Sequence, residues 1–100
     1  MVKKTPDPPP PPIWVYAYQL LPPQLADRLR TVQPLLDEEQ LHARRSGRTW
    51  AGRIVPEERI THILIVSDSP AQDHEANRHL ESELKKLKAR FTVSPPVVLS

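Results

Sequence analysis

A carboxylate between two serines follows the most apolar run of the sequence and precedes a proline. The segment reads THILIVSDSPAQD, and its carboxylate is Asp68. A strand that ends at an acid before a helix begins could hold a phosphate group or Mg²⁺. However, Ser69, Pro70 and Gln72 suit the N-cap, the first helical position and the third position of a capping box. We therefore interpret the segment as a structural corner, with a phosphate or Mg²⁺ site at Asp68 as the minor alternative.

The string ILIVSDS is similar to the first strand and acidic pocket of response-regulator receivers. Only 32 residues follow Asp68, too few for the repeated βα units that such a fold needs. The resemblance therefore fails on length, and no family is identified from the motifs.

The histidines are the other candidates for chemistry, and the sequence has four of them: His42, His62, His74 and His79. His74 and His79 are five residues apart, so they point in different directions on a helix. His62 lies in an apolar strand, as a core or rim histidine or as a pH-sensitive interface residue. There is no cysteine, and no nucleophile and base stand at a familiar spacing. We expect no metal site, no cofactor and no enzymatic activity.

Hydrophobic periodicity predicts four strands and two helical regions that would position these residues. The predicted strands are Ile13–Leu20, Arg48–Val55, Ile60–Ser67 and Arg90–Leu99, and the helical regions run from Gln24 to Gly47 and from Pro70 to about Lys88. Pro34 either kinks the first helical region or lies in the first turn of a second segment. Gly47 is a plausible C-terminal cap, and Gly52 is a candidate for a bulge.

The predicted order β-α-β-β-α-β indicates an α+β fold of the ferredoxin-like split βαβ type. In this arrangement the first and third strands are central in a four-stranded antiparallel sheet, and both helices cover one face. The third strand is apolar on both sides, as expected for a central strand, and Pro95 and Pro96 suit an edge. Residues 13–100 would form one domain. Residues 1–12 would be a proline-rich extended or disordered tail.

Composition limits the class of protein. With 38% hydrophobic and 26% charged residues, the chain is typical of a soluble globular domain. No apolar run approaches the roughly 20 residues of a membrane helix, and we expect neither a signal peptide nor a membrane partner. The absence of cysteine fits a cytoplasmic protein.

Two surfaces are candidate binding sites. In the first predicted strand Trp14, Tyr16 and Tyr18 alternate with smaller aliphatic residues, and we expect the aliphatic set to face the helices. The aromatic row would then lie on the open face of the sheet, where an apolar patch needs a cover. The second candidate is a basic patch, made of Arg44, Arg45, Arg48, Trp50 and Arg53.

Three functions compete for these surfaces. The first is a non-catalytic binding or regulatory module that forms a homodimer through the open face or an edge strand, with room for a small ligand at the dimer seam. The second is an RNA-binding domain like the RRM, although the third strand lacks the glycine and aromatics of its RNP1 motif. The third is an adaptor for a protein partner that uses the aromatic row or the proline-rich tail. For strand pairing, the edge Arg48–Val55 is the open one, so Ile54→Pro or Val55→Pro would weaken a dimer formed there.

Overall fold

The computed structural model describes residues 12–21, 26–57 and 60–99. The strands are β1 (Ile13–Leu20), β2 (Trp50–Pro56), β3 (Thr61–Ser67), β4 (Phe91–Val93) and β5 (Val97–Leu99). The helices are α1 (Val32–Arg45) and α2 (Glu75–Lys86), preceded by the short 3₁₀ helices η1 (Ala26–Leu29) and η2 (Ala71–Asp73). The expected proline-rich tail lies outside the described residues except for Pro12, and so does the expected helix start at Gln24.

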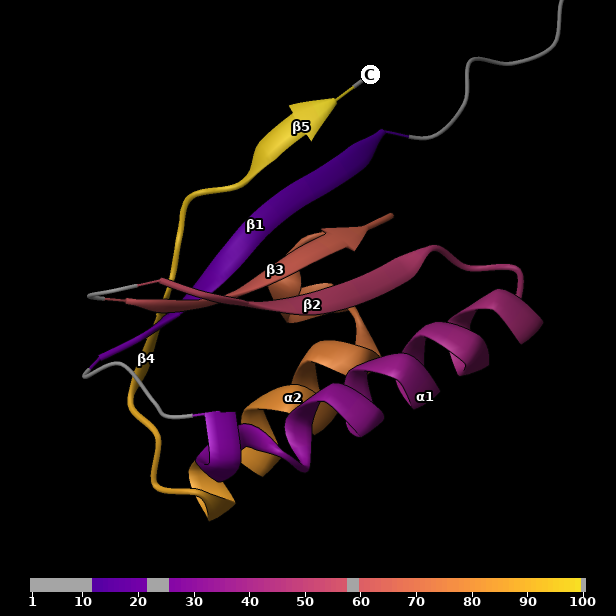
Figure 1. Ribbon diagram of the computed structural model, residues 1–100. Coiled ribbons are helices and arrows are strands. Elements are labelled where there is room, and N and C mark those ends of the chain that lie inside the picture. Colours follow the sequence, from indigo (N-terminus) through magenta and orange to yellow (C-terminus); the bar gives the residue numbers. More distant parts are fainter. Residues whose placement is uncertain (1–11, 22–25, 58–59, 100) are drawn as a thin grey trace, which may run out of the picture.

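The fold is α+β, with a five-stranded antiparallel sheet and both helices on one face (Figure 1). The strand order is β2-β3-β1-β4, and β5 also pairs with β1. The expectation of four strands is wrong, because the last predicted strand is divided into β4 and β5 with Pro95 and Pro96 between them. Proline has no amide hydrogen to donate to a ladder, so pairing stops there and resumes further along β1.

Pro34 lies in the first turn of α1, which confirms the second of the two interpretations of the first helical region. A proline costs little there, because its missing amide has no partner within the helix. At the other end, the Gly47 amide donates to the Arg44 carbonyl at 3.1 Å, and Gly47 has φ +72°. This left-handed conformation favours glycine, so its expected role as a cap is confirmed.

The expected capping box at Ser69 is wrong. The chain at Pro70 is extended, with φ −60° and ψ 160°, and η2 intervenes before the second helix. The N-cap of α2 is His74, whose Nδ1 accepts a hydrogen bond from the Ala76 amide at 3.1 Å. The second helix therefore begins about one turn later than its sequence signal indicates.

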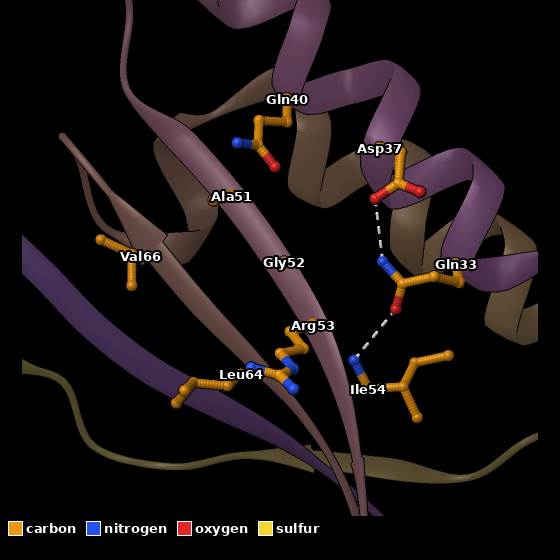
Figure 2. A pocket seen from close by; sticks show the side chains of 9 residues that line it. All are labelled: Gln33, Asp37, Gln40, Ala51, Gly52, Arg53, Ile54, Leu64 and Val66. Carbon is orange, nitrogen blue, oxygen red and sulfur yellow. Dashed lines mark hydrogen bonds between the residues drawn. The ribbon is translucent and has the colours of Figure 1, made fainter.

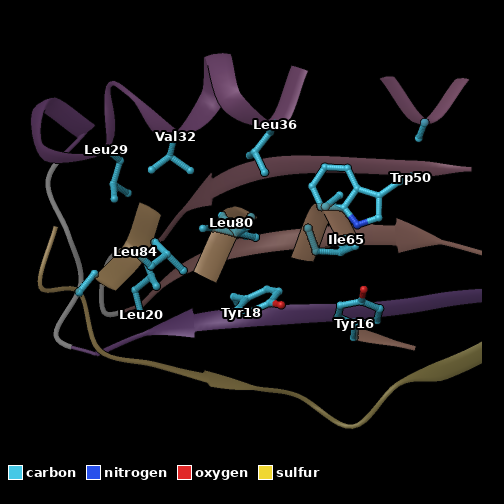
Figure 3. Packing of buried hydrophobic residues seen from close by; sticks show 14 residues of the cluster. Tyr16, Tyr18, Leu20, Leu29, Val32, Leu36, Trp50, Ile65, Leu80 and Leu84 are labelled. Atoms are coloured by element: carbon cyan, nitrogen blue, oxygen red, sulfur yellow. The ribbon is translucent and has the colours of Figure 1, made fainter. Parts of the chain in front are cut away.

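The core lies between the sheet and the two helices (Figure 3). Its fully buried aliphatic side chains are Leu20, Val32, Leu36, Ile63, Ile65, Leu80 and Leu84. Gly52 brings α1 close to β2: a Cβ atom there would lie 2.7 Å from Leu36 Cδ2. The register between β2 and β3 continues without a break through Gly52, so Gly52 serves close packing and the expected bulge is not formed. No helix of the described ranges is long and apolar enough to cross a membrane.

Candidate interaction surface

The aromatic row lies on the opposite face of the sheet from the one expected. Tyr16 and Tyr18 are 3% and 0% exposed and point from β1 toward the helices (Figure 3). Trp14 has the same parity and is half-buried against the same core. The alternation along β1 is as predicted, but its two faces are exchanged, and the row is not available as an open-face binding site.

One side chain explains how these tyrosines can be buried. Asn77 of α2 is 0% exposed, and its Oδ1 accepts hydrogen bonds from the Tyr16 hydroxyl at 3.0 Å and from Trp50 Nε1 at 3.1 Å. Its Nδ2 donates to the Tyr18 hydroxyl at 3.0 Å. That hydroxyl in turn donates to Glu81 Oε2 at 3.1 Å. A buried polar group without a partner is costly, so this network is what allows three aromatic side chains to fill the core.

The hydroxyl groups stay neutral in this environment. Burial raises the pKa of Tyr16, and burial also raises the pKa of Tyr18, with the Asn77 hydrogen bond acting in the opposite direction. The network is therefore an arrangement of neutral donors and acceptors closed by the Glu81 carboxylate. Nothing in this geometry makes either tyrosine an acid or base at neutral pH, and both serve the structure.

The open face of the sheet is aliphatic instead. The strand registers align its residues in rows across the sheet. Its apolar members are Ile13, Val15 and Ala17 on β1, Ala51 and Val55 on β2, Leu64 and Val66 on β3, and Val97 and Leu99 on β5. We call these nine residues the aliphatic face. Both helices lie on the other side of the sheet (Figure 1), so no helix of the described residues covers it.

Parts of the aliphatic face are strongly exposed. Leu64, Val97 and Leu99 are 40%, 58% and 54% exposed, and Leu64 lies on the second central strand, opposite Ala17 and Arg53. Single exposed apolar residues are ordinary, whereas a contiguous apolar surface is a candidate interaction site. Three of the nine residues, Ile13, Val15 and Ala17, were expected on the helix side, because they are compact and aliphatic.

Polar side chains border the aliphatic face at one end. His62 lies there on β3, opposite Gln19 of β1 and Val55 of β2. Its Nδ1 is 3.4 Å from Glu57 Oε1, and both residues line a hollow of about 270 Å³ that Ala17 and Leu64 also reach. His62 is therefore a rim residue of the open face, in line with the sequence interpretation.

A second hollow, of about 500 Å³, lies between α1 and the edge strand β2 (Figure 2). Gln33 of α1 spans it: its Oε1 accepts from the Ile54 amide at 3.2 Å, and its Nε2 donates to Asp37 Oδ1 at 2.9 Å. The outward amide of Ile54 therefore already has an acceptor from the helix. A helix laid along a strand edge in this way protects the edge from pairing with another chain.

The expected basic patch is assembled only in part. Trp50 is buried, and Arg53 lies on the opposite face of β2 from it. Arg44 and Arg45 are exposed in the last turn of α1. Arg44, Arg48 and Trp50 line a common hollow, which is about 240 Å³ in volume.

Asp68, the acidic residue after the strand β3, forms an ion pair with Arg48. The Arg48 Nη2 and Nε atoms lie 2.7 and 3.0 Å from the two carboxylate oxygens of Asp68, and the Thr49 amide donates to Oδ2 at 3.0 Å. The Arg48 hydrogen bond, together with the Thr49 amide, lowers the pKa of Asp68 to about 2. Asp68 thus joins the end of β3 to the start of β2, a structural role that leaves its carboxylate fully engaged.

Within residues 12–21, 26–57 and 60–99, no three or more His, Asp or Glu side chains are grouped so that they could hold a metal ion. His42 of α1 and His79 of α2 are exposed and line one hollow, where His79 Nδ1 lies 2.6 Å from Glu39 Oε1. His74 is buried at the start of α2. The chain matches no protein-family model, no curated protein and no solved structure.

Proposed function

We propose that this chain is a small non-catalytic binding module that forms a homodimer by packing the aliphatic face against the same face of a second copy. The observation that carries the proposal is the contrast between the two sides of the sheet. One side is sealed by two helices, and the other presents nine aliphatic residues with Leu64 at 40% exposure near its centre. Packing two such sheets face to face buries both apolar surfaces.

The composition of the aliphatic face favours a second copy as its cover. An interface about a two-fold axis brings the same patch of both copies together. The aliphatic face carries one fixed charge among its rows, Arg53, which is exposed on the edge strand β2. A charge at the rim can remain in water, so the centre of the interface would contain no unpaired ion.

Other elements of the proposal follow from this arrangement. The strand order β2-β3-β1-β4 supports the ferredoxin-like split βαβ topology as the finer description of the fold. The hollow beside His62 and Glu57 lies at one end of the proposed seam and offers room for a small ligand. The absence of cysteine supports a cytoplasmic location.

The alternatives have less support. An RRM-like domain stacks bases on exposed aromatic side chains of its central strands, whereas Tyr16 and Tyr18 are buried against α2. Gln33 opposes dimerisation through the β2 edge, because its Oε1 already accepts the hydrogen bond of the outward Ile54 amide. A protein partner on the aliphatic face remains the competing occupant, and the experiment below separates it from a second copy.

Molar mass measured by light scattering after size exclusion tests the proposal with a matched pair of variants. Leu64 and Leu41 are exposed to similar extents, 40% and 44%, but Leu41 lies on α1 away from the sheet. The wild type and Leu41→Glu should be dimers, and Leu64→Glu should be a folded monomer by circular dichroism. A monomeric wild type would refute self-association and leave a different protein as the partner. A dimeric Leu64→Glu would place the interface elsewhere.

A further inference from the structure

His74 is a buried histidine with one unused nitrogen. The residue is 6% exposed, and its Nδ1 accepts from the Ala76 amide at 3.1 Å. Nδ1 must therefore be unprotonated, and the neutral ring carries its hydrogen on Nε2. Nε2 is buried and has no hydrogen-bond partner among the described residues. The neutral ring is thus the form that this site accommodates.

Protonation of His74 would both remove the N-cap acceptor of α2 and add an unfavourable charge there. A proton on Nδ1 removes the acceptor that caps the Ala76 amide, because an imidazolium ring has only donors. The added positive charge would also lie at the N-terminus of α2, where the helix dipole favours negative charge. The backbone amide of Asn77, which donates to the His74 carbonyl at 3.2 Å, belongs to the same first turn of α2.

The charged groups around His74 only partly offset this cost. Burial and Arg48 lower the pKa of His74, while Asp68, Glu39 and Glu75 act in the opposite direction. The Asp68 carboxylate is already engaged by Arg48. The ring also lies beside the buried Trp50, with ring centroids 6.2 Å apart.

We propose that His74 is an acid-sensitive latch: its neutral ring holds the first turn of α2 against the corner where β2 begins and β3 ends, and its protonation releases that turn. Release reaches the core through Asn77, which is three residues further along and binds Tyr16, Tyr18 and Trp50. The fold therefore contains a local opening that mild acid favours. This device does not depend on what covers the aliphatic face.

The direction with pH follows from linkage. A histidine whose pKa is lowered by folding binds protons more readily in the open state, so the closed state is favoured above the ordinary pKa of about 6.5 and weakens as pH falls below it. The opening constant therefore rises as pH falls from about 7.5 to about 5.5, by at most about tenfold for one histidine with an ordinary pKa of about 6.5.

Hydrogen exchange of individual amides, divided by the intrinsic rate at each pH, tests the latch. In the wild type, protection of the backbone amides of Ala76 and Asn77 should fall across this range, by at most about tenfold, while the Leu80 and Leu84 amides of the same helix keep their protection. His74→Asn keeps a capping oxygen without the titration, and its protection should not change. His79→Gln, which removes an exposed histidine of the same helix, should behave as the wild type.

Two outcomes would overturn the latch. An equal loss of protection at Leu80 and Leu84 would show global destabilisation, and a response that persists in His74→Asn would assign it to another group. If His74→Asn does not fold, the ring resonances of His74 in the wild type decide the matter. A ring that titrates below about 6.5 supports the latch, and one that titrates at or above that value overturns it.

Discussion

The side-chain amide of Asn77 accepts a hydrogen bond from the Tyr16 hydroxyl at 3.0 Å, across 61 positions of sequence. This contact ties the second helix to the first strand inside the core. It determines which face of β1 is buried, because a tyrosine can turn inward only where its hydroxyl finds a partner. The aliphatic face lies on the side of the sheet away from the helices for the same reason (Figure 1).

Asn77→Ala should lower the free energy of unfolding by about 3 kcal/mol, because it leaves the Tyr16 hydroxyl and Trp50 Nε1 without their buried acceptor. Chemical denaturation followed by circular dichroism measures this. Ser82→Ala, an exposed change in the same helix, should change stability by less than about 0.5 kcal/mol. Equal stabilities for the two variants would contradict the role assigned to Asn77.

The ion pair between Arg48 and Asp68 predicts a loss of stability in strong acid. Folding lowers the pKa of Asp68 to about 2 from an ordinary value of 3.8, so the pair stabilises the fold above about pH 4. This contribution disappears as pH falls from about 4 to about 2. We expect about 1 kcal/mol, because Arg48 is 43% exposed and solvent screens the pair.

Stability curves of Asp68→Asn and wild type test this pH window. The two should differ at neutral pH and converge toward about pH 2. Asp73→Asn, at an exposed position, provides the control and should track the wild type. A constant difference between Asp68→Asn and wild type at every pH would show that the ion pair is not the cause.

Gly52→Ala should destabilise the fold by about 2 kcal/mol, since the new methyl group would lie 2.7 Å from Leu36 Cδ2 in a packed core. A double-mutant cycle gives the clearest measurement. In a Leu36→Ala background the cost of Gly52→Ala should shrink, because the nearest obstructing atom is gone while Ile65 Cδ1 remains at 3.1 Å. Additive effects of the two changes would contradict this account of the close approach between α1 and β2.

Ile54→Pro should leave the dimer intact. The Ile54 amide points outward to Gln33, so its removal spares the ladder to β3 and costs about 1 kcal/mol of stability. Alternation along an antiparallel pair directs the neighbouring Val55 amide inward to β3, so Val55→Pro should destabilise the fold more. Light scattering that showed a monomer for folded Ile54→Pro would favour pairing through the β2 edge.

Many elements of the fold could be predicted from the sequence. The bounds of β1 at Ile13 and Leu20 are confirmed, and so are the place of Pro34 and the cap at Gly47. These signals are local, because proline and glycine restrict or free the backbone wherever they stand. The division of the last strand at Pro95 and Pro96 has the same origin, although a single strand was expected there.

Which face of β1 is buried could not be predicted from local signals. Both faces of β1 are apolar, and alternation alone separates the faces without ranking them. The missed signal is on α2, where Asn77 and Glu81 are four residues apart beside Leu80 and Leu84. Polar side chains on the buried stripe of a helix imply buried donors opposite them, and the tyrosine hydroxyls of β1 are those donors. The start of α2 was misplaced because His74, which rarely caps a helix, does so here.

The most direct test of the aliphatic face is an isotope-filtered NOE experiment on a dimer mixed from labelled and unlabelled chains. The account predicts intermolecular contacts among the methyl groups of Leu64, Val66 and Val97. Contacts that instead connect the methyl groups of Leu35 and Leu41 on α1, or a sample with no intermolecular contacts at all, would contradict the proposed interface.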